Sequence, residues 1–395
     1  MTIIITDIAV LLLRWFHIIA AIAWVGASFY FIWLENALNR AGKQRGDNIA
    51  GHLWAVHGGG FYYVEKHKTA PLPLPSPLHW FKWEAYATWF SGMALMVVVY
   101  YANAPAMLLA ENADIGSLAA AALSVAFFAA GYGCYAALCR TALINKPLML
   151  AFIALALLAA AAEMLYALFS ARAVFLHIGA LIGTIMAANV LMVIIPAQKK
   201  AVAAAEKGES PSAEVIAAGL YAARRSLHNN YLALPVVLLM IAGHAPVLYD
   251  NRAATAVLIL MILGLFAARH FFNCKNRGTK EWKWLYLAAV LIMAAMAAAA
   301  FSSAALTSAK GAPDFAAARA VITKHCVQCH SAAPVFVGIA VAPGGFVLDT
   351  EAQILAGREL IFSRAVLSNS MPPGNITKMT DTERAALAAW AAKEE

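Results

Sequence analysis

The sequence predicts an all-α fold, in which a polytopic membrane bundle of about eight transmembrane helices precedes a small helical C-terminal domain. Hydrophobic residues make up 63% of the 395 residues and charged residues only 13%, with a mean hydropathy of +0.70. Soluble domains are near half apolar and a quarter charged. Long apolar runs fill the chain up to about residue 306, after which charged residues return. We therefore expect a membrane domain over 1–306 and a soluble domain over 307–395.

Eight apolar runs have about the ~20 residues that a helix needs to cross the hydrocarbon core of a bilayer. They lie at 8–34, 83–104, 117–139, 147–169, 173–196, 229–248, 253–274 and 284–306. The first run contains Arg14 and lacks a small-residue cleavage site before a polar region. We therefore interpret it as a retained span and not as a removed signal peptide.

Basic residues are unevenly distributed over the connections between these runs. The connections after the first, third, fifth and seventh runs hold eighteen Lys and Arg, and the other three hold only Arg172 and Arg252. By the positive-inside rule the first set is cytoplasmic. Both termini then lie outside, which in a bacterial inner membrane is the periplasm. Because topology explains the net charge of +8, we expect no nucleic-acid partner.

The strongest motif is a Cys-Val-Gln-Cys-His segment that ends at His330. This spacing is that of covalent haem c attachment, in which Cys326 and Cys329 form thioethers and His330 ligates the iron. A disulfide or a zinc half-site is the alternative, but the domain has no second cysteine pair. For the sixth ligand we prefer Met371, which precedes a rigid Pro-Pro-Gly turn, over Met379. The alternative for either methionine is core packing. Haem c attachment occurs outside the cytoplasm, in agreement with the charge distribution.

The histidines of the membrane domain form two layers in the predicted topology. His17, His177 and His244 lie on the outer side. The inner layer consists of His52, His57, His67, His79, His228 and His270. Ligand-capable groups inside a bilayer are costly and are functional candidates, and two of them at one depth can ligate a haem b. The outer three are therefore candidate haem b ligands, with interhelical hydrogen bonding as the alternative.

Further polar residues gather on the predicted cytoplasmic side. The candidate substrate contacts are His57, Lys82, Glu84, His228, Asn229 and Asn230. Amide, imidazole and charged groups suit a planar polar ligand. The structural alternatives are a snorkelling interfacial cation for Lys82 and helix capping for the two asparagines. Three glycines after His57 permit unusual dihedrals or close approach to a ligand, but they lack the Lys and Ser/Thr of a phosphate loop.

Six segments of the membrane domain carry a resemblance to a known family. They are Arg14–Phe29, His57–Tyr62, His79–Tyr86, Gly183–Val190, His228–Tyr231 and Arg269–Asn273. In these segments and in the haem c motif the chain resembles the PuuD-type membrane-bound urate hydroxylases, or urate dehydrogenases. That family is described as an eight-span bacterial membrane domain fused to a C-terminal cytochrome c. The chain departs from the family pattern around His244, where its neighbours are less polar.

The resemblance implies an enzyme that oxidises urate with water to 5-hydroxyisourate. The two electrons would pass through membrane haem to the fused haem c, and then to a soluble or membrane cytochrome or a terminal oxidase. Two other functions remain open. One is a quinol or other small-molecule dehydrogenase that feeds the same cytochrome. The other is a transporter with a redox-sensing tail, although transport predicts spans broken at midplane and such interruptions are sparse here.

Overall fold

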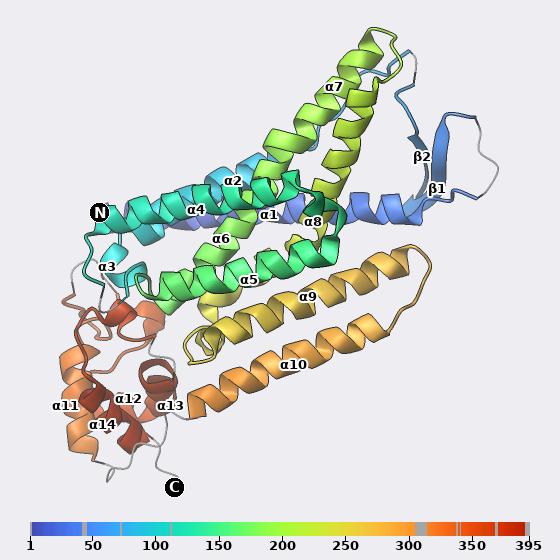
Figure 1. Ribbon diagram of the computed structural model, residues 1–395. Coiled ribbons are helices and arrows are strands. Elements are labelled where there is room, and N and C mark those ends of the chain that lie inside the picture. The colour runs from blue at the N-terminus through green and yellow to red at the C-terminus, as the bar shows by residue number, and fades with distance from the viewer. Residues whose placement is uncertain are drawn as a thin grey trace.

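The computed structural model describes residues 2–41, 46–71, 73–110, 113–304, 314–336, 339, 341–367 and 370–391. The N-terminal part contains α1 (Thr2–Ala37), β1 (Ile49–His57), β2 (Gly60–His67), α2 (Trp83–Leu95), η1 (Met96–Tyr101), α3 (Ala104–Met107), α4 (Ser117–Arg140), η2 (Ala142–Asn145), α5 (Pro147–Tyr166), α6 (Ala171–Asn189), η3 (Val190–Ile194), α7 (Ile195–Glu206), α8 (Ala213–Ile241), η4 (Ala242–His244), η5 (Pro246–Leu248), α9 (Ala254–Asn276) and α10 (Lys283–Ala304). The C-terminal part contains α11 (Phe315–His325), η6 (Pro343–Gly345), α12 (Glu351–Ala356), α13 (Arg358–Ile361), η7 (Phe362–Leu367), η8 (Pro373–Asn375) and α14 (Asp381–Ala391). The predicted all-α polytopic bundle is confirmed (Figure 1).

Seven of the described helical segments are long and apolar enough to cross a membrane, against the eight that the sequence predicts. The predicted span over 83–104 is divided among α2, the π-helix η1 and the start of α3. α2 has only 13 residues, a length of about 20 Å, and it contains the polar Glu84 and Ser91. The protein is thus a multi-pass membrane protein with an eighth, less regular helical segment beside its seven apolar ones.

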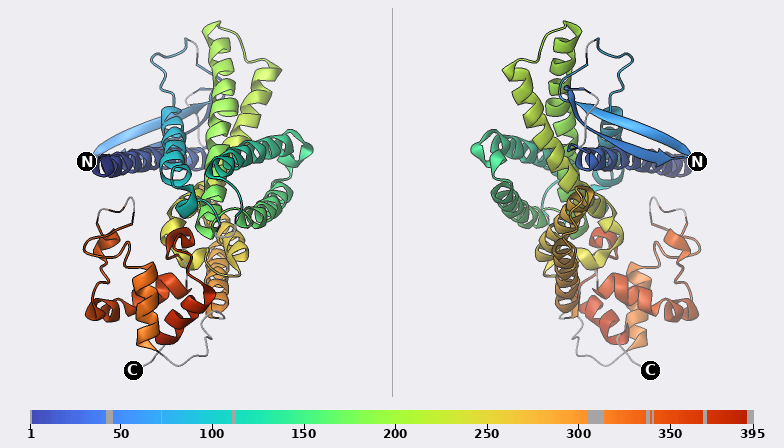
Figure 2. Two further views of the ribbon diagram at one scale, coloured as in Figure 1. Left: turned by 90° about the vertical axis from the view of Figure 1, so that its left-hand side faces the viewer. Right: turned by 90° about the vertical axis from the view of Figure 1, so that its right-hand side faces the viewer.

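The connections that are rich in Lys and Arg all lie at one end of the bundle. In Figure 1 the strands β1 and β2, the turn between α4 and α5, the tip of α7 and α8, and the turn between α9 and α10 lie toward the right. The N-terminus and the C-terminal domain lie at the left-hand end. Figure 2 shows α7 and α8 and the C-terminal domain on opposite sides of the bundle from two further directions. This arrangement is the alternation that the distribution of basic residues predicts.

A short antiparallel sheet, which the sequence analysis did not predict, lies between α1 and α2. β1 and β2 pair from Ile49 opposite His67 to His57 opposite Gly60. Gly58 and Gly59 form the connecting turn with positive φ angles of 58° and 78°, which is the conformation that favours glycine in a two-residue hairpin. The glycines after His57 therefore serve the hairpin turn in this structure.

Glycines bring the membrane helices into close contact. The most buried helix is α6, which packs against α4 and α8. A Cβ on Gly131 would lie 2.6 Å from a methyl carbon of Leu181, and one on Gly179 would lie 2.8 Å from Cβ of Leu239. α9 and α10 form the most extensive helix pair, and Gly264 marks their closest approach. Small residues at such positions let helix backbones pack closely inside a membrane.

Replacing Gly264 with alanine is expected to destabilise the α9–α10 pair by about 1–3 kcal/mol through overpacking. The added Cβ would lie 2.9 Å from Cγ1 of Ile292 and 3.3 Å from the carbonyl oxygen of Ala288. Gly133 is a matched control, because no atom lies within 4 Å of a Cβ built there. Alanine at 133 should be neutral or stabilising, since glycine is the poorer helix former. Thermal unfolding in detergent measures both variants, and equal effects would contradict the prediction.

The C-terminal domain has its own small hydrophobic core. α11 and α14 pack together, and η7 lies against α14. Ile322, Leu348, Leu387 and Met379 are among its most buried residues. This core is separate from the large apolar cluster of the membrane helices.

Candidate active site and haem c site

Two polar residues, Asn189 at the C-terminal end of α6 and Asn229 in the middle of α8, hold these helices together. Asn189 donates from Nδ2 to Oδ1 of Asn229 (2.8 Å) and to the hydroxyl of Tyr135 (3.1 Å). Asn229 donates in turn to the backbone oxygen of Met186 (3.0 Å). The Tyr135 hydroxyl also lies 2.8 Å from Nδ1 of His228. Side chains from α4, α6 and α8 thus form one hydrogen-bonded cluster.

Arg225 belongs to the same cluster, one helical turn before His228. Its guanidinium carbon lies 4.4 Å from the centroid of the Tyr135 ring, and the residue is only 1% exposed. Nε and Nη1 have no hydrogen-bond partner in the part of the chain that the structure describes. From its place between two apolar runs, Arg225 is expected to be a cytoplasmic loop charge. Arg225 precedes His228 by three residues and Asn229 by four, and this spacing places all three on one side of a helix. The spacing could have indicated that Arg225 belongs to the same cluster.

A second buried arginine lies close to the neighbouring residue of α8. Arg269 on α9 donates from Nε to Oδ1 of Asn230 (2.8 Å), and Asn273 donates to the same oxygen (3.2 Å). The guanidinium carbon of Arg269 lies 4.0 Å from the centroid of the Phe29 ring on α1. Nη2 of Arg269, Nδ2 of Asn230 and Oδ1 of Asn273 have no partner. Asn230 is therefore shared between α8 and α9, as Asn229 is between α8 and α6.

We call these eight residues the inner polar site. They are Tyr135, Asn189, Arg225, His228, Asn229, Asn230, Arg269 and Asn273. The site consists of one group around Arg225 and a second group around Arg269, which are joined through the adjacent residues Asn229 and Asn230 of α8. Within the described residues, neither arginine forms an ion pair. A buried charge without a counter-ion costs several kcal/mol, so the fold retains two such charges against a substantial penalty. Guanidinium groups beside unpaired amides and aromatic rings are suited to binding a planar anion.

Three of the predicted substrate contacts are not part of this site. His57 is exposed at the turn of the hairpin. Lys82 precedes α2 with its ammonium 5.4 Å from the centroid of the Trp83 ring, as expected for an interfacial cation. Glu84 is half-buried in the first turn of α2. No contact recorded for the described residues joins these side chains to the arginines. The structure brings together only the three predicted contacts on α8.

The three outer histidines occupy different surroundings. His177 is completely buried, and its Nε2 and Nδ1 lie 2.7 Å from Oγ of Ser124 and from the carbonyl oxygen of Ala173. Nδ1 of His17 lies 2.9 Å from Oγ of Ser91, and His244 is exposed in η4. In the described part of the chain no contact joins any two of these histidines. With both nitrogens of His177 engaged, this arrangement does not favour it as an iron ligand.

The haem c motif lies between the end of α11 and the loop that leads to η6. Nδ1 of His330 lies 2.9 Å from the carbonyl oxygen of Phe346, so Nδ1 can donate there and leave Nε2 for iron. Cys326 and Cys329 are free thiols. Burial, and secondarily the nearby Cys329, raises the pKa of the Cys326 thiol to about 12. A sheltered thiol pair beside an oriented imidazole fits the attachment of haem c.

The two candidate sixth ligands differ in their surroundings. Met379 is 2% exposed in the core of the C-terminal domain, and its backbone is bonded to Asn375. Met371 is half-buried at the start of the turn that contains η8. Its carbonyl oxygen accepts a hydrogen bond from Nη1 of Arg384 (3.0 Å), and its backbone N–H donates to the carbonyl oxygen of Arg364 (3.0 Å). Packing accounts for Met379, whereas Met371 is held in place by its backbone with its side chain outside the core.

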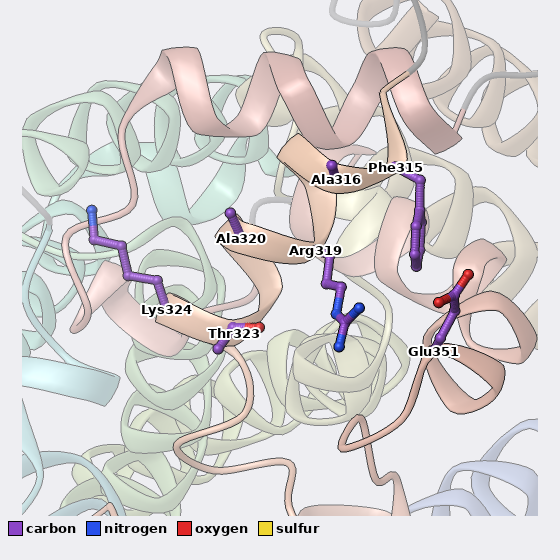
Figure 3. Close-up of a pocket in the computed structure, with 7 residues that line it drawn as sticks. All are labelled: Phe315, Ala316, Arg319, Ala320, Thr323, Lys324 and Glu351. Carbon is purple, nitrogen blue, oxygen red and sulfur yellow. The ribbon is translucent and has the colours of Figure 1, made fainter.

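Two hollows lie elsewhere, and none of the residues of the inner polar site lines either of them. A shallow depression of about 510 Å³ lies along α11, where Phe315, Arg319 and Glu351 gather at one end (Figure 3). An apolar cavity of about 380 Å³ lies between α2, α4 and α6 and is lined by aromatic residues such as Trp89, Phe128 and Tyr132. The depression contains none of the motif residues, and the cavity offers almost no polar surface.

The fold and the inner polar site define a class of protein: a multi-pass membrane protein with a buried, positively charged polar site between its helices. The family model described as urate oxidase, N-terminal, matches residues 3–300, and the chain belongs to this family. The matched region covers nearly the whole membrane domain and ends before the C-terminal domain begins. No curated protein and no solved structure matches the chain.

Proposed function

We propose that the protein binds urate at the inner polar site and oxidises it to 5-hydroxyisourate, with the electrons leaving through haem c in the C-terminal domain. The observation that carries this proposal is the pair of buried arginines, Arg225 and Arg269, which have unpartnered nitrogens and no counter-ion among the described residues. Urate is a planar monoanion with several carbonyl oxygens. It would supply the charge and the acceptors that these groups lack, and membership of a urate-related family supports this choice of anion.

The residues of the inner polar site divide the tasks of binding and proton transfer. The two guanidinium groups bind urate oxygens through charge-assisted hydrogen bonds. The unpaired Nδ2 of Asn230 can donate to a carbonyl oxygen of urate, and the unpaired Oδ1 of Asn189 can accept from a ring N–H of urate. The Tyr135 hydroxyl is 2.8 Å from His228, so this pair can accept a proton as electrons leave the purine. Burial of the site between the helices keeps these interactions strong, because little water competes with them.

The reaction releases two electrons and two protons for each urate and water consumed. Cys326, Cys329, His330 and Met371 would hold haem c, which accepts one electron at a time, so each urate requires two electron transfers. Tyr135, Asn189 and Arg269 lie in the C-terminal parts of α4, α6 and α9. The C-terminal domain lies beside the other ends of these helices, so electrons would cross much of a ~30 Å hydrocarbon core. Haem b held by outer-layer histidines stays a prediction. A reduced protein with only a c-type absorption band would exclude it.

The proposal includes an orientation in the membrane. We place the protein in a bacterial inner membrane, with the N-terminus and the C-terminal domain in the periplasm. The basic connections gather at the opposite end of the bundle, as expected for a cytoplasmic face, and haem c is attached outside the cytoplasm. A soluble or membrane cytochrome, or a terminal oxidase, would then accept the electrons on the periplasmic side.

Anaerobic mixing of membranes with urate, followed by haem absorbance, tests the proposed function. We expect haem c to be reduced on addition of urate, and Cys329→Ala membranes to show no such signal. The apolar cavity beside Trp89 and Tyr132 favours a quinol as the second candidate substrate. A quinol added in place of urate distinguishes the two. Reduction by quinol and not by urate would contradict the proposed function.

A further inference from the structure

The C-terminal domain touches the membrane domain at the turn that follows Met371. There η8 lies against the short helix α3. Gly374 in this turn has a φ of +58°. A Cβ on Gly374 would lie 2.7 Å from the carbonyl oxygen of Pro105 and 3.0 Å from that of Ala106. Both the backbone conformation and the space at this point therefore require glycine.

Arg384 holds the Met371 loop beside this turn and interacts electrostatically with Asp250 of the membrane domain. Nη1 of Arg384 on α14 donates to the carbonyl oxygens of Met371 (3.0 Å) and Ala365 (2.6 Å). Asp250 lies in the loop before α9 of the membrane domain. Burial raises the pKa of Asp250 to about 7, and the nearby Arg384 opposes that rise. The cation that holds the Met371 loop is thus close enough to an acid of the membrane domain to interact with it.

A chain of polar side chains leads from the bundle interior toward the same place. Tyr101, at the end of η1, lies three residues before α3 begins. Its hydroxyl lies 2.7 Å from Oγ of Ser124, which lies 2.7 Å from Nε2 of the buried His177. The turn at Gly374 therefore rests on a segment that is tied to the centre of the membrane domain.

We propose that η8 is a docking element that holds the Met371 loop on α3, and that this contact is where electrons pass from the membrane domain to haem c. The inference rests on the proposed function. Gly374 is three positions after Met371, so at most about 11 Å of chain lies between the proposed sixth ligand and the contact. Docking by this turn keeps the haem c site at a fixed, short separation from the membrane domain.

Two substitutions at Gly374 test the proposal. Gly374→Ala adds a Cβ that meets the backbone of α3, and Gly374→Asn adds the same Cβ on a residue that tolerates positive φ. The matched control is Gly344→Ala, because Gly344 has a φ of +64° and no atom within 4 Å of a built Cβ. Staining for covalent haem and reduction by dithionite verify that each variant carries a folded haem c domain.

Two readouts apply to the full-length protein. Hydrogen exchange of the amides over 103–109 reports docking on α3, and the rate of urate-driven haem c reduction reports electron transfer. In both Gly374 variants the amides over 103–109 should exchange faster than in the wild type. Urate should reduce haem c roughly tenfold more slowly, or more slowly still, since small displacements at a reacting contact have large rate effects. Gly344→Ala should match the wild type.

The outcomes separate this inference from the proposed function. Wild-type exchange or wild-type reduction rates in both Gly374 variants would overturn the inference, because the turn would then be either undocked or not on the electron path. Failure of urate to reduce the wild-type protein would instead refute the proposed function, and the exchange measurement would still report whether η8 docks on α3.

Discussion

Arg225→Met is expected to abolish most urate-dependent haem reduction while leaving thermal stability unchanged or raised. The guanidinium is buried with two unpartnered nitrogens, so removing it relieves an uncompensated charge in the resting protein. Urate would lose a charge-assisted hydrogen bond of about 3 kcal/mol, which corresponds to roughly a hundredfold loss in kcat/KM. The measurements are the rate of haem reduction as a function of urate concentration, and thermal unfolding in detergent.

Arg224 is the matched control for this substitution, because it precedes Arg225 on α8 and is exposed. Arg224→Met should retain both activity and stability. The opposite movement of activity and stability in Arg225→Met distinguishes a binding residue from a structural one. A variant that unfolds at a lower temperature and loses activity in proportion would show that Arg225 only supports packing. Wild-type kinetics with urate would show that Arg225 does not bind urate.

Met371→Ala is expected to retain covalent haem but to lose the sixth iron ligand. Haem would still be attached through Cys326 and Cys329. A thioether ligand raises the reduction potential of haem, and axial ligands set this potential over a range of about 0.8 V. We therefore expect the potential to fall by on the order of 100 mV or more, with a changed absorption spectrum. Potentiometric titration of the purified protein measures both effects.

Met379→Leu is the control for the methionine ligand. Because Met379 packs in the core of the C-terminal domain, leucine should cost less than about 1.5 kcal/mol and leave the haem potential unchanged. The reverse pattern, with a lowered potential in Met379→Leu and a normal one in Met371→Ala, would exchange the roles of the two residues. Cys329→Ala is the reference variant for defective haem attachment, since it removes one of the two covalent attachments.

The helical segments were predictable because their signals are local. A run of about 20 apolar residues must form a helix in lipid, where each backbone polar group needs a partner within its own segment. The span over 83–104 was the exception, because Glu84 and Ser91 interrupt it and its helix changes form at Met96. The hairpin at Ile49–His67 was missed because its strands lie in a polar connection that composition alone assigned to a loop.

The inner polar site was predictable only in part. His228, Asn229 and Asn230 are adjacent polar residues at the predicted start of a span, which marks this segment of α8, but adjacent side chains of a helix point to different neighbours. Arg225 and Arg269 resembled ordinary cytoplasmic charges, and their burial depends on α4, α6 and α9 closing around α8. His57 and Lys82 were grouped with them by their predicted depth, but depth does not specify which side of a helix faces the bundle.

The sequence by itself determined the membrane class, the alternation of the connections and the Cys-x-x-Cys-His spacing that predicts haem c attachment. Each of these depends on residue type and spacing along the chain. Only the tertiary structure decided which polar residues meet, that the two buried arginines lack counter-ions, and that Gly374 brings the Met371 loop onto α3. These features arise from packing between segments far apart in the chain, and the free energy of that packing depends on all of the segments together.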